Sequence, residues 1–182
     1  KGFGAVERVN CPYCGSTLDP GEDGALELAQ AANRQRRKSA LPLHVRGKLD
    51  DIEWEIIGIQ WREARVDGLV YPWQEFLLFN PWEGFRFLIY SMTDGQWSIG
   101  VPLDGAPQMR AGMGHRTCKF KGETYKHFAD SPAVTVYVEG EFSWQVEVGD
   151  HGFSSEFVAP PRSISVETSQ SEGGSELNFT EL

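Results

Sequence analysis

The sequence lacks several features that would place it in a specialised class of protein. No run of eighteen apolar residues occurs, and the richest apolar stretch, from Phe76 to Met92, is interrupted by polar residues, Pro81 and Gly84, so no membrane-spanning helix is expected. Three cysteines are too few and too unevenly placed for a disulfide framework, and they fit a reducing, cytoplasmic setting. Walker-type, G-x-S-x-G and H-E-x-x-H patterns are all missing, so no common catalytic motif is present.

Positive charge is also scarce. The chain of 182 residues has 17 Lys and Arg against 26 Asp and Glu, a net charge of −9. The charge is uneven, because residues 1–50 have a net charge of +2 and residues 51–182 one of −11. A general nucleic-acid binder needs a basic surface, so this class is excluded for the second segment and stays open for the first.

The local amino-acid composition divides the chain into three segments. Residues 1–24 form a short unit that ends in turn residues, and we expect residues 25–40 to be a helical linker. Ala and Leu are dense there, and Arg34 to Lys38 lie where cations suit the end of a helix. Residues 41–182 are predicted to form a β domain.

The β domain is predicted from short runs of β-forming residues broken by Gly, Pro and Asp, about 8–12 residues apart. This pattern of short, evenly spaced runs favours an antiparallel β-sandwich or partly open barrel, and the runs fall into two halves of about five strands each. We expect Ile164, Val166, Leu177 and Phe179 in the acidic tail to add strands to the sheet. The strongest expected strands are Trp54–Trp61, Trp73–Phe79, Phe85–Ser91, Gln96–Val101, Thr117–Phe120, Tyr125–Phe128, Ala133–Val138, Phe142–Val148, Phe153–Val158, Ser163–Glu167 and Leu177–Thr180.

One motif has definite chemistry, the Cys-Pro-Tyr-Cys-Gly sequence that begins at Cys11. A glutaredoxin-type redox site would need a helix after Cys14, but Gly15-Ser16-Thr17 cannot open a stable one. Two thiolates in a tight turn between β-type runs, with a glycine next, fit a zinc knuckle. A structural zinc needs four ligands, so we expect half of a zinc ribbon whose first knuckle lay upstream of Lys1. The alternatives are a free or disulfide-forming pair, and a site completed by Cys118 or a histidine.

Candidate binding residues come from the tryptophans and acidic residues. Trp54, Trp61, Trp97 and Trp144 lie inside strand patterns and are expected in the core, although Trp144 is also a candidate for binding. Trp73 and Trp82 flank prolines, where an exposed indole can bind a partner. The i,i+2 carboxylate pair Glu139 and Glu141 is expected on an exposed strand face.

The sequence is therefore compatible with two classes of function. The first is a non-enzymatic binding or scaffold domain with a protein partner. The second is an enzyme of unrecognised type, with Glu75, Glu141 or a histidine in a cleft between the two β halves. A cleft that brings Glu75 and Glu141 together with a histidine would favour the enzyme, and an exposed tryptophan surface would favour binding.

Several spaced motifs together resemble the bacterial Domain of Unknown Function 4178 family. The resemblance covers residues 41–182, although the family usually has Leu-Gly where this chain has Leu43-His44. The motifs that carry it are Leu41-Pro42-Leu43, Gly47, Trp54-Glu55-Ile56-Ile57-Gly58, Tyr71-Pro72-Trp73-Gln74-Glu75-Phe76-Leu77-Leu78, Asp94-Gly95-Gln96-Trp97, Gly140-Glu141-Phe142-Ser143-Trp144, Ala159-Pro160-Pro161 and Ser165-Val166-Glu167.

The resemblance implies architecture and context rather than a reaction. Members of the family commonly carry paired Cys-Pro-x-Cys-Gly knuckles ahead of the domain, which implies that Cys11 and Cys14 form the second of two. Members are also often followed by hydrophobic membrane segments. We therefore expect a cytoplasmic protein whose association with the inner face of the membrane would depend on parts outside this chain.

Overall fold

The computed structural model describes residues 8–10, 17–20, 26–30, 37–112, 115–171 and 174–182, and within these ranges the chain is built of antiparallel β-strands. No helix in these ranges meets the length and apolarity that crossing a membrane requires. The strands are β1 (Arg8–Asn10), β2 (Thr17–Pro20), β3 (Leu26–Gln30), β4 (Arg46–Leu49), β5 (Ile52–Val66), β6 (Leu69–Asn80), β7 (Gly84–Ser91), β8 (Trp97–Pro102), β9 (Gln108–Gly112), β10 (His115–Phe120), β11 (Glu123–Phe142), β12 (His151–Ala159), β13 (Arg162–Ser171) and β14 (Gly174–Glu181).

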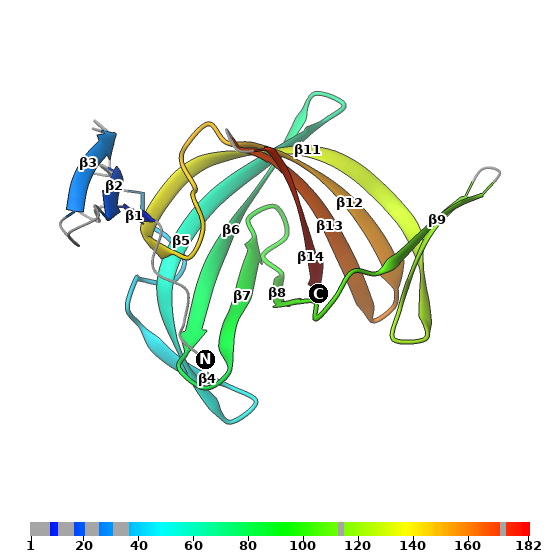
Figure 1. The fold of residues 1–182 in the computed structure, drawn as a ribbon, viewed down its shortest axis with the longest axis horizontal. Coiled ribbons are helices and arrows are strands. Elements are labelled where there is room, and N and C mark those ends of the chain that lie inside the picture. The colour runs from blue at the N-terminus through cyan, green and yellow to red at the C-terminus, as the bar shows by residue number, and fades with distance from the viewer. Residues whose placement is uncertain (1–7, 11–16, 21–25, 31–36, 113–114, 172–173) are drawn as a thin grey trace.

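The described strands belong to one sheet that arches into a partly open barrel (Figure 1). The order of hydrogen-bonded neighbours is β3-β2-β1-β11-β12-β13-β14-β8-β7-β6-β5-β4, and β5 pairs in addition with β11. The expected mainly-β, partly open barrel is confirmed. The strands do not separate into two five-stranded halves, because β11 runs for 20 residues and pairs with β1, β5, β10 and β12.

Two-residue turns set the register of the long hairpins. Asp67 and Gly68 both have positive φ, 50° and 80°, and join β5 to β6. Lys121 and Gly122, at 45° and 87°, join β10 to β11 in the same way. Positive φ at both central residues matches the twist of antiparallel strands, and this explains why Asp-Gly and Lys-Gly stand there.

The sequence misplaces two elements within the described ranges. Leu26–Gln30, predicted as part of a helix, forms β3 and pairs with β2. Phe142–Val148, predicted as a strand, contains the end of β11 followed by a loop. In that loop the Asp150 carboxylate accepts a hydrogen bond from the Glu147 backbone N–H at 2.7 Å, which stabilises a turn instead of a strand.

The expected tail strands are confirmed. β13 pairs with β12 along its length, and β14 pairs with β13 from Ser171↔Gly174 to Ile164↔Glu181. Leu182 continues this ladder, because its backbone exchanges two hydrogen bonds with Ser163, each 2.9 Å long.

The buried apolar side chains form three clusters. The first is centred on Trp54, Ile59 and Phe76 and lies beside residues 41–43 and β4. The second joins Leu77, Val138 and Phe142 to Val146 in the loop after β11. The third gathers Cys118, Tyr125, Phe157 and Ile164 from four consecutive strands of the sheet.

Close approach of two strands requires glycine at Gly58 and Gly140, which face each other in the β5–β11 ladder. Gly140 has a φ of 94°, and a Cβ there would collide with the Ile57 carbonyl oxygen. A Cβ at Gly58 would lie 2.6 Å from the Glu141 carbonyl oxygen and 2.8 Å from the Phe142 ring. The two glycines therefore let β5 and β11 pack tightly at the second cluster.

Candidate functional site

A buried charged cluster lies on one face of β5 and β6. The Asp67-Gly68 turn pairs Gln60 with Glu75 and Arg62 with Trp73, so the four side chains share a face. This face is called the Arg62 face below. Ile59, Trp61 and Phe76 belong to the opposite face, because side chains alternate along a strand.

Arg62 joins two carboxylates from strands that are distant in sequence. Its Nη1 lies 2.7 Å from Oε2 of Glu167 on β13, its Nη2 donates to the other oxygen of that carboxylate, and Oε1 of Glu75 lies 3.4 Å from Nη1. The Arg62 side chain is 8% exposed, that of Glu75 12% and that of Glu167 27%. The guanidinium thus connects β5 and β13, which are separated in the sheet by β11 and β12.

A glycine makes room for this connection. A Cβ on Gly152 of β12 would lie 2.6 Å from Oε1 of Glu167 and 3.0 Å from Nη2 of Arg62. Any side chain at this position would therefore displace the ion pair. The missing side chain of Gly152 is what allows Arg62 to reach β13.

Glu75 is held by further donors. Gln60 donates to its Oε2 at 2.5 Å, and the Trp73 indole N–H donates to its Oε1 at 2.6 Å. The Arg62 guanidinium also lies over the Trp73 ring, 5.6 Å from its centroid. Three donors therefore surround the carboxylate of Glu75 and fix its position.

The electrostatics of the cluster favour a permanently charged arginine. Burial opposes the charge on Arg62, but the carboxylates of Glu75 and Glu167 outweigh it and raise the arginine pKa above its ordinary value. The Arg62 Nε is buried with no hydrogen-bond partner among the described residues. The cluster can brace the sheet by a buried ion pair and hydrogen bonds, and neither of its carboxylates is placed beside a histidine.

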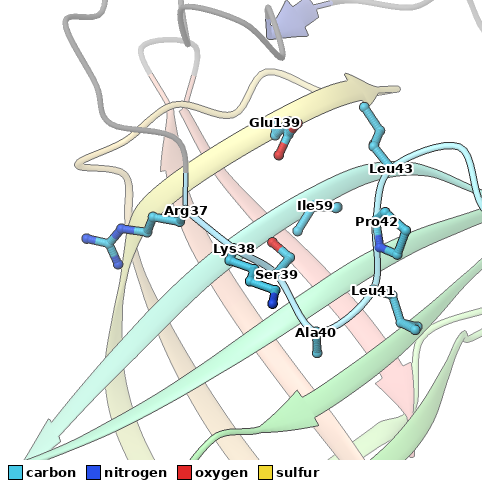
Figure 2. Close-up of a pocket in the computed structure, with 9 residues that line it drawn as sticks. All are labelled: Arg37, Lys38, Ser39, Ala40, Leu41, Pro42, Leu43, Ile59 and Glu139. Atoms are coloured by element: carbon cyan, nitrogen blue, oxygen red, sulfur yellow. The ribbon is translucent and has the colours of Figure 1, made fainter.

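A shallow groove lies on the opposite face, between β5, β11 and residues 37–43, which we call the strap (Figure 2). Its volume is about 440 Å³, and Ile59 and Glu139 form its floor. Glu139 is buried, contrary to the exposed position expected from the sequence, and accepts a hydrogen bond from the Tyr137 hydroxyl at 2.9 Å.

Polar contacts fix the strap to the sheet. The Trp61 indole N–H donates to the Ser39 hydroxyl at 3.1 Å, and the Ala40 backbone N–H donates to the Gln74 side chain at 2.8 Å. Arg37 lies over the Trp61 ring, 5.2 Å from its centroid. The groove is thus bordered by the polar residues Arg37, Lys38 and Ser39 and the apolar residues 40–43, with Glu139 as its buried acid.

The structure does not bring the predicted binding residues together. Trp73 and Glu75 are in contact on the Arg62 face, whereas Glu141 is exposed on the opposite face. Trp82 is 90% exposed in the turn after β6. Trp144 is half-buried, packed against the rings of Phe87 and Phe142 at centroid distances of 6.0 and 5.1 Å.

The four tryptophans expected in the core differ in how deeply they are buried. Trp54 is buried, Trp61 and Trp144 are half-buried, and Trp97 is 44% exposed. Trp97 was predicted in the core because it lies in a strand pattern. Its ring packs against those of Tyr90 and Phe76, at centroid distances of 4.6 and 5.8 Å, and these contacts still leave 44% of the residue exposed.

The other reactive side chains form no catalytic constellation within the described ranges. Burial raises the pKa of the Cys118 thiol, and this residue is enclosed in the third apolar cluster. His127 lies 3.1 Å from Asp130, but the Ser155 hydroxyl donates to that carboxylate and not to the histidine. No group of three or more potential metal ligands occurs among the described residues. Cys11 and Cys14 lie outside them.

Sequence reasoning missed Arg62, Gln60 and Glu167. A signal existed for the first two, because an Asp-Gly turn at residues 67 and 68 predicts that Gln60 faces Glu75 and Arg62 faces Trp73. No local pattern connects Glu167 with Arg62, which lies 105 residues earlier.

Exposed apolar side chains gather at one end of the sheet. Among the twelve large hydrophobic residues exposed in the described ranges, four lie on the β5–β6 hairpin, which projects beyond the arch, and two lie at the β7–β8 turn (Figure 1). We call these six the apolar end: Val66, Leu69, Val70, Tyr71, Met92 and Trp97. The hairpin and the turn are joined, because the Met92 backbone N–H donates to the Pro72 carbonyl at 3.0 Å.

Comparison with known proteins identifies a family. A family model described as a domain of unknown function, DUF4178, matches residues 43–178. No curated protein and no solved structure matches the chain.

Proposed function

The chain belongs to the DUF4178 family, described as a domain of unknown function, and we propose that its β domain is a non-catalytic protein-binding domain. The apolar end carries this proposal. Leu69 is 61% exposed at the tip of the hairpin, and the exposed residues Val66, opposite it in the ladder, and Tyr71 share its face. Clustered exposed apolar side chains are costly in water, and they commonly mark interaction sites.

The acidic cleft of the alternative enzyme hypothesis finds no support in the geometry. Glu75 is bound to Arg62, Gln60 and Trp73, and Glu141 faces the other side of the sheet. General acid–base chemistry needs a titratable group within reach of a substrate. The carboxylate of Glu75 is enclosed by its own donors, and we therefore favour binding over catalysis.

A comparison of matched variants tests the proposal. The full-length protein is used as bait in extracts of its source cells, either as wild type or with Leu69→Ser and Tyr71→Ser together. The control is Phe128→Ser, which removes another exposed apolar side chain, 72% exposed, on β11. We expect a partner that is retained by wild type and by the control and lost from the hairpin variant.

Two results would count against the proposal. The first is a partner retained equally by all three proteins, which would place binding elsewhere on the chain. The second is the absence of any protein that binds reproducibly, together with turnover of a small molecule by the purified chain.

For residues 1–24 we propose a zinc-binding arm, supported by the spacing of Cys11 and Cys14 and by Gly15 after them. Zinc content is measured in the present chain and in a protein extended upstream of Lys1. We expect about one zinc per chain in the extended protein, lost on Cys11→Ser. An extended protein without zinc would refute the proposal.

A further inference from the structure

β9, β10 and residues 123–126 of β11 form a small three-stranded extension of the sheet, which we call the arm (Figure 1). β10 is its central strand, because Thr117 pairs with Arg110 of β9 on one side and with Lys126 of β11 on the other. Residues that lie opposite each other in an antiparallel ladder share a face. Cys118 and Tyr125 therefore share one face of the arm, and both are buried in the third apolar cluster. The other face points away from that cluster.

This other face, called the basic face below, carries three cations. Arg110, Lys119 and Lys126 all lie on it, and all three residues are exposed. Thr117 lies between Arg110 and Lys126, and Thr124 lies opposite Lys119. The spacing of strands places Arg110 and Lys126 about 10 Å apart, and the rise along β10 places Lys119 about 7 Å from Thr117. The three cations thus form a triangle on an exposed sheet surface, with hydroxyl groups among them.

The described residues supply no carboxylate that neutralises the basic face. Glu123, the one acid in the three strand segments of the arm, lies on the opposite face, where it pairs with Arg162. On β12, Glu156 lies on the same side of the sheet as the basic face, but its carboxylate accepts hydrogen bonds from two serine hydroxyls, at 2.6 and 2.8 Å. Within the described ranges, no ion pair joins a cation of the basic face to an acidic residue.

The charge of the rest of the chain distinguishes between anionic occupants. Three neighbouring cations repel one another, and an anionic occupant relieves this repulsion. The chain nevertheless has a net charge of −9 with these cations included, so a long polyanion or an anionic membrane that reaches beyond the arm meets a negative protein. A short acidic segment avoids this repulsion. Alternate side chains of an extended segment lie about 7 Å apart on one side, which suits the spacing of the cations.

We propose that the basic face of the arm binds a short acidic segment of a partner protein. Carboxylates at alternate positions of the extended segment pair with Arg110, Lys119 and Lys126, and its polar groups bond to the hydroxyls of Thr117 and Thr124. The arm shares no residue with the apolar end, so this inference goes beyond the proposed function and does not rest on it.

The first test adds probe peptides to the full chain. The probe is acetyl-Glu-Ser-Glu-Ser-Glu-Ser-Glu-amide, and glutamine replaces each glutamate in the comparison peptide. An exposed ion pair changes affinity by about twofold to fivefold, so three pairs should make the acidic peptide bind about tenfold more tightly or better. Added salt should weaken its binding. Equal binding of the two peptides would overturn the inference.

Matched variants show whether the arm is responsible. The arm variant combines Arg110→Gln, Lys119→Gln and Lys126→Gln. The control variant loses the same charge at three exposed positions elsewhere, through Lys38→Gln, Lys48→Gln and Arg65→Gln. We expect the arm variant to bind the acidic peptide at least about tenfold more weakly than the control variant. Equal binding by the two variants would show that only net charge matters and would overturn the inference.

Folding is checked by circular dichroism, and exposed substitutions of this kind usually change stability little. If the arm variant does not fold, Lys119→Gln alone is compared with Lys48→Gln. We then expect a difference of about twofold to fivefold in affinity for the acidic peptide, and equal affinity would count against the basic face. Lys119→Arg together with Lys126→Arg keeps both charges and should preserve binding.

Two other probes test the choice of an acidic protein segment. One is an oligothymidylate of about twelve nucleotides, and the other is vesicles that contain phosphatidylserine. The quantity compared is the binding that the arm variant loses and the control variant keeps. We expect this part to be smaller for both probes than for the acidic peptide, because both extend beyond the arm. A larger loss with either probe would overturn the choice of occupant.

Nuclear magnetic resonance of the full chain locates the bound peptide. We expect the acidic peptide to shift the amide signals of Arg110, Thr117 and Lys119, and shifts confined to other parts of the chain would overturn the inference. The variant with Leu69→Ser and Tyr71→Ser should bind the peptide as tightly as wild type. If it does and no partner depends on the apolar end, the basic face stands and the proposed function fails. If the peptide does not bind but partner capture still depends on Leu69 and Tyr71, the proposed function stands alone.

Discussion

Replacing Arg62 by methionine should strongly destabilise the fold. Methionine replaces the aliphatic stem of arginine with an unbranched apolar side chain of similar length and removes the charge that lies between Glu75 and Glu167. Both carboxylates would stay on the Arg62 face without their cation. The effect measures how far the stability of the sheet depends on the connection between β5 and β13.

The size of the effect follows from burial. Breaking a buried ion pair by removing one partner costs about 3–5 kcal/mol, because the remaining charge is left uncompensated. The 8% exposure of Arg62 and the 12% exposure of Glu75 place their interaction in this range, and the 27% exposure of Glu167 reduces its share. With an m-value of about 2 kcal/mol/M, a loss of about 3 kcal/mol lowers the urea midpoint by about 1.5 M.

The assay is equilibrium urea unfolding followed by tryptophan fluorescence at pH 7. A second protein combines Arg62→Met with Glu75→Gln and Glu167→Gln and so removes the uncompensated charges. We expect it to recover at least half of the lost stability, because replacing an entire buried ion pair is far less costly than breaking it. A loss below about 1 kcal/mol for Arg62→Met alone, the range of an exposed pair, would refute the reasoning.

Three further predictions concern other parts of the fold. Gly140→Ala should lower the free energy of unfolding in urea by about 2–4 kcal/mol, because its Cβ would strike the Ile57 carbonyl oxygen. Gly149→Ala, at a similar φ but with open space around it, should lower this free energy clearly less, and equal losses would contradict the close approach of β5 and β11. Hydrogen bonding from Arg116 lowers the pKa of Asp130, so this carboxylate contributes stability above its ordinary pKa and loses that contribution as pH falls through the lowered value. The difference in unfolding free energy between wild type and Asp130→Asn should therefore shrink below about pH 4, and a difference that stays constant with pH would contradict this. In a protein with Cys11→Ser and Cys14→Ser, the buried Cys118 thiol, whose pKa is raised, should react with a thiol reagent at least about a hundredfold more slowly than in urea, and fast reaction of the native protein would show that the third apolar cluster opens readily.

The β architecture could be predicted because it depends on local signals. Prolines, glycines and aspartates divide the chain into short β-forming runs, and the structure has strands at nearly all of them. The expected runs at 125–128 and 133–138 proved to be one strand, β11, in which Pro132 lies between them and β12 pairs on one side. Strand ends were therefore less predictable than strand positions.

The errors arose where tertiary contacts override local pattern. Phe142 and Val146 alternate with polar residues as in a strand, but both are buried because the loop folds back over Leu77 and Val138. Leu26–Gln30 has good helix formers, yet it pairs with β2. Intrinsic preference is a weak guide when a neighbouring strand is available for pairing.

The candidate surfaces and contacts also differ in how far the sequence could predict them. The sequence marks Trp82 next to Pro81 as a candidate exposed indole, although packing was the favoured interpretation, and the residue is 90% exposed. The place where β14 pairs with β8 could not be predicted, because residues 97–100 carry no information about it. The ion pair of Arg62 with Glu167 likewise exists only once the sheet has curled.

The long β11 strand, together with the late partners of β5 and β8, has a consequence for how the protein is made. β5 cannot complete its ladder until β11 has been synthesised, and Val101 of β8 cannot pair with Glu181 until 80 more residues have been synthesised. Pairings between such distant segments form slowly, because a large loop must be closed before they contribute any stability. On the ribosome, the apolar rows of β5 to β8 therefore stay without their final neighbours until these later strands have emerged, and during that time they are a natural target for chaperones.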